Sequence, residues 1–128
     1  MSNETNKPVD YVYDAKVVRV IDGDTIDVLI RWDIGFGVKC ETLQRLRLSM
    51  IDAPEVRGEE REEGLKAKAA LVQLFNDHEE MILVKTSKDD AFGRYIAEVY
   101  VYPRGGEEED QINVNYWLVD NGYATLFE

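Results

Sequence analysis

The order of elements in the sequence predicts a mainly β fold with helices (α+β by content). We expect a five-stranded barrel with a long helix between strands three and four and a short C-terminal helix. Segments rich in β-branched and aromatic residues lie on both sides of one helical stretch, separated by turn signals. A chain of 128 residues with 45% apolar residues suffices for one modest core. We therefore expect a single domain over residues 1–128, with residues 1–10 as a flexible tail.

The first two strands are expected at residues 11–20 and 24–32, where the segment Ile-Asp-Gly-Asp between them is a turn signal. They would form a hairpin. Residues 32–40 contain two glycines and predict a loop. A third strand follows at residues 42–51 and ends before Pro54, which cannot donate a hydrogen bond to a sheet.

Residues 60–77 change to a helical period and predict an amphipathic helix of about four turns. Its apolar stripe is expected from the spacing of Leu65, Ala69 and Val72, widened by Leu71, Leu74 and Phe75. Strand character returns at residues 81–87 and 94–102, which predicts a second hairpin. Residues 113–122 predict a short helix with Asn113 as its N-cap and Gly122 as its terminator.

The charge of the chain argues against a protein that coats nucleic acid passively. Twenty-six acidic residues against fifteen basic residues give a net charge of −11, which repels a polyanion at long range. The single cysteine, Cys40, excludes an internal disulfide framework and a cysteine-based zinc site. No apolar run reaches the roughly 20 residues needed to span a membrane, and the polar N-terminus lacks a signal-peptide core. We expect a protein that is cytoplasmic or otherwise unexported and has no membrane partner.

The segment Arg45 to Gly58 raises the functional question, because Asp52 and Glu55 flank the proline that ends the third strand. Phosphodiester hydrolysis needs positive charge on the phosphoryl oxygens and a base beside an attacking water. Arginines with a divalent cation held by carboxylates supply that charge. In an acidic chain, each of these residues could also be an ordinary turn, loop or cross-strand residue. The order and spacing of these residues must decide between a catalytic site and an ordinary structural role.

The segments Ile21–Thr25, Arg47–Glu55 and Phe92–Arg94, followed by a helix ending in Asn-Gly-Tyr-Ala, strongly resemble the staphylococcal nuclease family. The resemblance runs from about Asp14 to Phe127. It implies an OB-fold, a barrel that commonly binds oligonucleotides. It also implies a calcium-dependent phosphodiesterase that cuts DNA and RNA and leaves 5′-hydroxyl and 3′-phosphate ends.

The resemblance assigns a role to each matching position. Asp24 and Asp52 match the carboxylates that bind one Ca²⁺ ion, Ala53 matches the position that supplies a backbone carbonyl ligand, and Asp22 matches an outer acid. Glu55 matches the general base. The phosphate-binding arginines of the family correspond to Arg47 and Arg94, and Phe92 matches a substrate contact that is typically tyrosine.

Two departures from the family pattern weaken the expected binding of substrate. Ala91 replaces a common lysine, and the sequence stops at Glu128, before the second of two nucleotide-binding tyrosines and a third helix. The apolar surface left near Trp117 and Phe127 leads us to expect a homodimer through the C-terminal region. The alternative to an endonuclease is a catalytically weak or silent OB-fold module that binds nucleic acid or protein.

Overall fold

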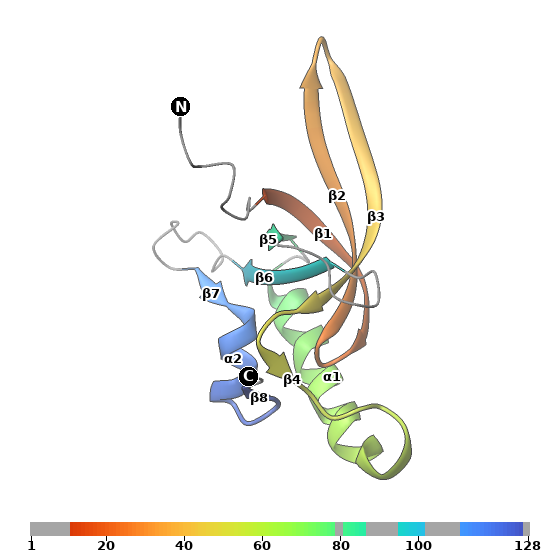
Figure 1. The fold of residues 1–128 in the computed structure, drawn as a ribbon, viewed down its shortest axis with the longest axis vertical. Helices are drawn as coiled ribbons and strands as arrows, with labels where there is room; N and C mark the ends of the chain where they lie inside the picture. The colour runs from red at the N-terminus through yellow and green to blue at the C-terminus, as the bar shows by residue number, and fades with distance from the viewer. Residues whose placement is uncertain (1–10, 79–80, 87–94, 102–110, 127–128) are drawn as a thin grey trace, which may run out of the picture.

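The strands and helices follow the predicted order (Figure 1). The computed structural model describes residues 11–78, 81–86, 95–101 and 111–126. The strands are β1 (Tyr11–Asp22), β2 (Thr25–Gly35), β3 (Val38–Leu48), β4 (Ile51–Asp52), β5 (Met81–Thr86), β6 (Tyr95–Val101), β7 (Ile112–Asn113) and β8 (Thr125–Leu126). The helices are α1 (Arg61–Asp77), preceded by the 3₁₀ turn η2 (Gly58–Glu60), and α2 (Val114–Asp120).

The main sheet closes into a barrel. Its strand order is β3-β2-β1-β5-β6-β7, and an additional parallel pairing joins β3 to β6. The strands β1, β2, β3, β5 and β6 therefore form the closed five-stranded barrel that the sequence predicts. Helix α1 lies between the third and fourth barrel strands in sequence, and α2 follows the barrel. No helix in the described ranges is long and apolar enough to cross a membrane.

The inside of the barrel is a continuous apolar core. Strand alternation turns every second side chain of β2 inward, so that Ile26 and Val28 are 0% exposed. Leu46 and Leu48 of β3 and Val99 of β6 are buried to the same extent. The closed barrel thus gives a rigid frame to any side chain that projects from β3 on its other face.

Helix α1 buries a different stripe from the one expected. The buried residues are Gly64, Ala67, Leu71, Leu74 and Phe75, whereas Leu65 and Val72 are 40% and 36% exposed and Ala69 is also exposed. The expectation was correct for Leu71, Leu74 and Phe75 and wrong for Leu65, Ala69 and Val72. In its first turns, α1 approaches the rest of the molecule through residues with little or no side chain.

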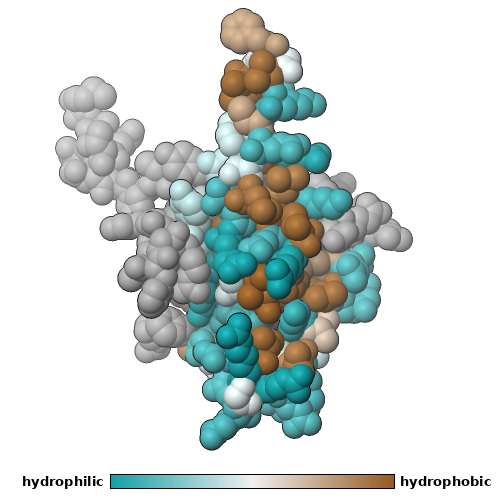
Figure 2. All heavy atoms as spheres, turned by 90° about the vertical axis from the view of Figure 1, so that its right-hand side faces the viewer, coloured by the Kyte–Doolittle hydropathy of each residue, from teal (hydrophilic) through white to brown (hydrophobic). Residues whose placement is uncertain are grey.

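The loop expected at residues 32–40 was also wrong, because β2 and β3 continue through most of it. Cross-strand pairs extend to Asp33↔Lys39 and Gly35↔Val38, and only residues 36 and 37 lie between the two strands. Gly37 takes a positive φ of 75°, which suits glycine at a tight turn. Residues 31–41 form a two-stranded projection, called the arm below, that extends beyond the other strands (Figure 1). Figure 2 shows apolar side chains beside polar ones at its outer end.

Helix α2 has the predicted caps. The Asn113 side chain accepts a hydrogen bond from the backbone N–H of Tyr116, and Gly122 follows the helix with a φ of 79°. Asn115, which is 3% exposed, accepts from the N–H of Val99 and donates to the carbonyls of Ser49 and Ala97. This buried amide joins α2 to β6 and to the turn after β3. The two-residue strands β4, β7 and β8 were not predicted.

Candidate active site

The turn between β1 and β2 places two acids side by side. Asp22 ends β1, and its Oδ1 accepts a hydrogen bond of 3.1 Å from the backbone N–H of Asp24. This contact is the usual way in which an aspartate stabilises a tight turn. Asp24 is 7% exposed, which is uncommon for a carboxylate. The acidic turn is therefore directed into the protein and is not a solvated loop.

Asp24 connects the turn to the segment after β4. Its Oδ2 accepts a hydrogen bond of 2.9 Å from the backbone N–H of Ala53, a residue 29 positions away in sequence. Its Oδ1 accepts a hydrogen bond of 3.1 Å from the hydroxyl of Thr25. These contacts fix the orientation of the carboxylate and hold two of the predicted metal-binding positions, Asp24 and Ala53, next to each other.

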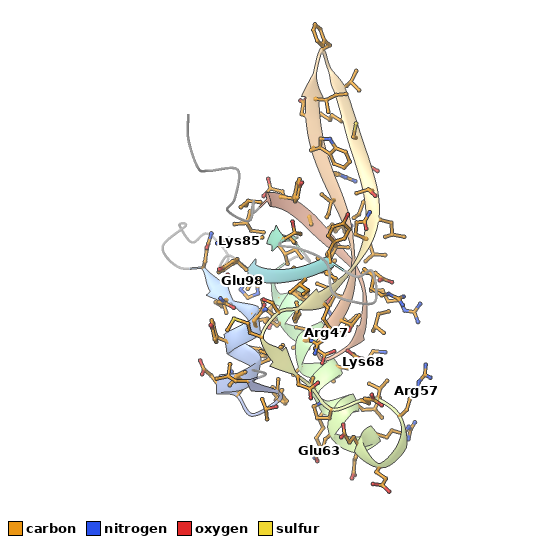
Figure 3. All side chains as sticks on the ribbon, viewed as in Figure 1. Arg47, Arg57, Glu63, Lys68, Lys85 and Glu98 are labelled. Atoms are coloured by element: carbon orange, nitrogen blue, oxygen red, sulfur yellow. The ribbon has the colours of Figure 1, made fainter. Side chains whose placement is uncertain are left out.

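Arg47, which is labelled in Figure 3, contacts both predicted metal-binding carboxylates. Its Nη2 is 3.4 Å from Oδ2 of Asp24 and 3.6 Å from Oδ1 of Asp52. The same guanidinium donates hydrogen bonds to the carbonyls of Leu48 at 2.8 Å and Ile51 at 2.9 Å. The Arg47 side chain is 19% exposed, so one planar cation is fixed from several sides and still meets solvent.

Asp52 and Glu55 reach solvent from the segment that follows β3. The Asp52 side chain is 63% exposed, and its backbone pairs with Thr125 in the small β4–β8 sheet. Strand β4 ends at Asp52, before Pro54, and the Glu55 side chain is exposed. The backbone N–H of Glu55 donates a hydrogen bond of 3.0 Å to Oε2 of Glu60, which holds the loop against the start of the helical segment.

Burial changes the acidity of Asp24. Its pKa is raised from 3.8 to about 6, chiefly because burial disfavours the charged form, and side-chain hydrogen bonding with Asp22 acts in the same direction. The hydrogen bond from Ala53 and the charge of Arg47 act in the opposite direction. A buried carboxylate with a raised pKa beside an arginine is typical of functional sites. A cation bound next to Asp24 would favour its charged form.

The donors in this region fit a hard divalent cation that keeps open positions. Two carboxylates and one backbone carbonyl are oxygen ligands of the kind that Ca²⁺ prefers, and Ca²⁺ takes six to eight of them. Within the described ranges, no three or more histidine, cysteine, aspartate or glutamate side chains come together as a metal-binding group. A cation held by Asp24, Asp52 and the carbonyl of Ala53 would therefore need water or substrate oxygens to complete its shell.

The structure brings together Asp22, Asp24, Arg47, Asp52 and Ala53, and it places Glu55 on the same loop as Asp52 and Ala53. The predicted residues Phe92 and Arg94 lie outside the described ranges. Their roles stay predictions, as do those of the residues that the structure describes.

Sequence reasoning missed the small residues that pack around the site. A Cβ atom at Gly23 would lie 2.8 Å from Cβ of Ala53 and 2.9 Å from Cβ of Ala67. A Cβ atom at Gly64 would lie 2.0 Å from the carbonyl oxygen of Glu55. A glycine inside a helical pattern was an available signal, because glycine is a poor helix former and often marks a close approach.

Comparison with known proteins identifies sequence relatives of this chain. The family described as staphylococcal nuclease homologues matches residues 45–128. Protein ParB of Escherichia coli is 37% identical over 113 residues, covering 88% of this chain and 56% of that protein. A micrococcal nuclease of Shigella flexneri is 35% identical over 115 residues, covering 88% of this chain and 57% of its own length.

An uncharacterized endonuclease of Escherichia coli O157:H7 is 30% identical over 113 residues, again covering 88% of this chain and 60% of its own length. The chain thus spans little more than half the length of these curated relatives. The family match covers more than half of the chain and includes the segment with Arg47, Asp52 and Glu55. The chain therefore belongs to the staphylococcal nuclease family.

Proposed function

We propose that the chain is a calcium-dependent endonuclease that hydrolyses phosphodiester bonds of DNA and RNA to 5′-hydroxyl and 3′-phosphate ends. Membership of the family and the names of two relatives, a micrococcal nuclease and an uncharacterized endonuclease, support nuclease chemistry in general. The observation that carries the proposal is the guanidinium of Arg47, fixed within 3.4 Å and 3.6 Å of two carboxylates. A site made only for stability would not need three charged groups at one partly open position.

The proposed metal ligands are Asp24, Asp52 and the carbonyl of Ala53, with Asp22 behind Asp24. When bound, Ca²⁺ supplies positive charge to a phosphoryl oxygen and lowers the barrier to attack by water. The hydrogen bonds to Asp24 from Ala53 and Thr25 keep its carboxylate in place before any cation arrives. The protein itself therefore sets the orientation of this carboxylate.

Arg47 and Glu55 have different roles: Arg47 binds the phosphate, and Glu55 is the general base. Arg47 donates hydrogen bonds to two phosphoryl oxygens and stabilises the additional negative charge of the transition state. Glu55 accepts a proton from the attacking water, whose oxygen forms the new bond to phosphorus. The P–O5′ bond breaks, and the leaving oxygen takes a proton from solvent to become the 5′-hydroxyl. Arg94 is proposed as a second phosphate contact and Phe92 as a contact to the substrate.

A plasmid-nicking assay tests this proposal directly. The full chain should nick DNA with Ca²⁺, nick it much less with Mg²⁺, and not nick it in the presence of a chelator. Glu55→Gln should lower kcat by about 10²- to 10⁴-fold, the usual contribution of a positioned base. Glu62→Gln, at an exposed acid of helix α1, is the matched control and should be as active as the unmodified chain.

The ends of the products test the bond that breaks. If the proposal holds, a polynucleotide kinase labels the product 5′ ends without prior dephosphorylation. Binding of nucleic acid without any cleavage would overturn the proposal in favour of a silent binding module. Cleavage that is unaffected by Glu55→Gln would remove the base assignment alone.

A further inference from the structure

We propose that Gly64 is a positioning residue for catalysis: the missing side chain lets helix α1 pack on the backbone of Glu55, and this contact fixes where the Glu55 carboxylate stands. The inference rests on the proposed function, because it takes Glu55 as the base. It adds a residue on the helix that is not one of the charged groups of the site. It also explains the small residues in the first turns of α1.

The contact between Gly64 and the loop is backbone against backbone. A Cβ atom at Gly64 would lie 2.0 Å from the carbonyl oxygen and 2.4 Å from the carbonyl carbon of Glu55, and 2.8 Å from the backbone nitrogen of Val56. All three distances are shorter than non-bonded atoms accept. Because none of these atoms belongs to a side chain, no rotamer change can relieve the overlap. Either the helix or the loop has to move.

The loop is held by hydrogen bonds before this contact and at it. Before it, the backbone N–H of Ala53 donates to the buried carboxylate of Asp24 at 2.9 Å. At the contact itself, the N–H of Glu55 donates to Oε2 of Glu60 at 3.0 Å. The loop therefore has one preferred position, in which Glu55 follows closely after the residues that surround Arg47.

The helix is also fixed on the same side, one turn further along. Gly23, in the acidic turn, lies so close to Ala53 and Ala67 that a Cβ atom there would be 2.8 Å and 2.9 Å from their Cβ atoms. The turn, the loop and helix α1 thus meet at a single small-residue contact. A shift of α1 away from the loop would also disturb its packing on the acidic turn.

Glycine at this place is unfavourable for the helix itself. It is the poorest helix former after proline, because its backbone loses the most freedom. In the absence of the contact, Gly64→Ala should therefore stabilise the protein. With the contact, the added methyl group should displace the Glu55 backbone by about 1 Å, a misplacement that can cost about 10²-fold in rate. Without the contact, Gly64→Ala should raise the stability of the protein. With the contact, it should lower the rate of cleavage.

The test measures kcat and KM for cleavage of DNA with Ca²⁺ in the unmodified chain, Gly64→Ala, Glu55→Gln and the double variant. We expect Gly64→Ala to lower kcat by about 10²-fold while KM changes by less than about threefold, because the substrate contacts of Arg47 are retained. In the Glu55→Gln background, Gly64→Ala should lower kcat by less than about threefold, because the base that it would displace is already absent.

Two controls separate positioning from stability. Val101→Ala removes a methyl pair from a buried residue of β6 and should lower the melting temperature without changing kcat at a temperature where the protein is folded. Glu60→Ala removes the acceptor of the Glu55 N–H at an exposed position and should lower kcat several-fold without loss of fold. It provides the test if Gly64→Ala does not fold.

Unchanged kcat with a raised melting temperature in Gly64→Ala would overturn the inference. A further 10²-fold loss of kcat when Gly64→Ala is added to Glu55→Gln would also overturn it, because Gly64 would then act on something other than the base. Amide hydrogen exchange at Glu55 and Val56 gives a readout without activity and should be faster in both Gly64→Ala and Glu60→Ala. If the unmodified chain does not cleave DNA, the proposed function fails. Unchanged exchange in both variants would separately refute the positioning contact.

Discussion

Arg47 shows how one side chain can be fixed in place by groups that belong to several segments. It contacts the carboxylate of Asp24 from the turn, that of Asp52 from β4, and two backbone carbonyls at the end of β3 and the start of β4. A planar guanidinium can satisfy these acceptors together because its donors point in fixed directions. Arg47 could be selected from the sequence as a candidate site residue. Its four partners could not, because they depend on how the chain turns after Leu48.

Replacement of Arg47 by lysine tests this geometry. A lysine keeps the charge but cannot hold two phosphoryl oxygens in one plane, so Arg47→Lys should lower kcat by about 10²- to 10³-fold. Arg45→Lys is the matched control, because Arg45 lies two residues earlier on β3 and pairs with Asp27 at 2.8 Å. Steady-state kinetics of both variants should separate them. Equal losses would mean that the arginines act through the strand and not through the site.

The raised pKa of Asp24 predicts a pH dependence of stability in the metal-free protein. Because the folded-state pKa of about 6 lies above the unfolded value of 3.8, the folded state binds the proton more tightly. The contribution to stability is complete below about pH 4 and is lost as the pH rises to about 6. For this carboxyl, which is 7% exposed, the loss amounts to about 3 kcal/mol at most.

Urea unfolding in a chelator, at intervals between pH 4 and pH 7, measures this dependence. Asp24→Asn should unfold with a flatter pH profile than the unmodified chain and should be the more stable of the two at pH 7. Parallel pH profiles for the two proteins would show that Asp24 does not titrate between these values.

At the scale of elements, the hairpin β2–β3 divides into two parts with different environments. Near the barrel, Ile26, Val28 and Ile30 are at most 5% exposed. In the arm, Ile34 is 58% and Phe36 105% exposed, and the strands are joined by cross-strand pairs such as Arg31 with Glu41 at 2.9 Å. Glycines predicted a loop there, whereas opposite charges at paired positions support strands. The charges were visible in the sequence, but their pairing depends on the register.

This division predicts a gradient of amide hydrogen exchange along the hairpin. A two-stranded ribbon without a covered face is marginally stable in water, so the amides of the arm should exchange well before those of residues 26–30. Exchange should be measured at two protein concentrations. Protection of the arm that increases with concentration would instead indicate that a second molecule covers it. The predicted homodimer through the C-terminal region stays a separate prediction.

At the scale of the whole molecule, the predictable part is the order of strands and helices, and the unpredictable part is how they meet. Helix α1 was expected from its period, but its first turns bury Gly64 and Ala67, which have little or no side chain. The contact exists because α1 lies against a turn and a loop that are distant in sequence. The charged residues of the candidate site could be selected from their order in the sequence, because carboxylate and guanidinium side chains indicate which chemistry they can support.

Calcium should stabilise the whole molecule through the proposed site. A ligand that binds only the folded state adds about 2.7 kcal/mol at a hundredfold excess over its Kd, which raises the melting temperature by several degrees. Asp24→Asn should lose most of this rise, because it removes a ligand. Glu62→Gln should keep it. Calorimetry with and without Ca²⁺ distinguishes these cases, and equal responses of all three proteins would indicate diffuse binding to the acidic surface.

The pairing that closes the barrel determines when during folding the site can first exist. Arg47 pairs with Thr25 of β2 within the hairpin, and also with Ile96 of β6, which is distant in sequence. The hairpin can form early, but contacts between distant segments form late because closing a long loop costs entropy.

Trp32 lies in the hairpin and Trp117 in α2. In refolding of variants that keep only one tryptophan, activity should return with the fluorescence change of Trp117 and after that of Trp32. A chain with only the β2–β3 hairpin formed would then have Arg47 paired with Thr25 but would lack the rest of the candidate site.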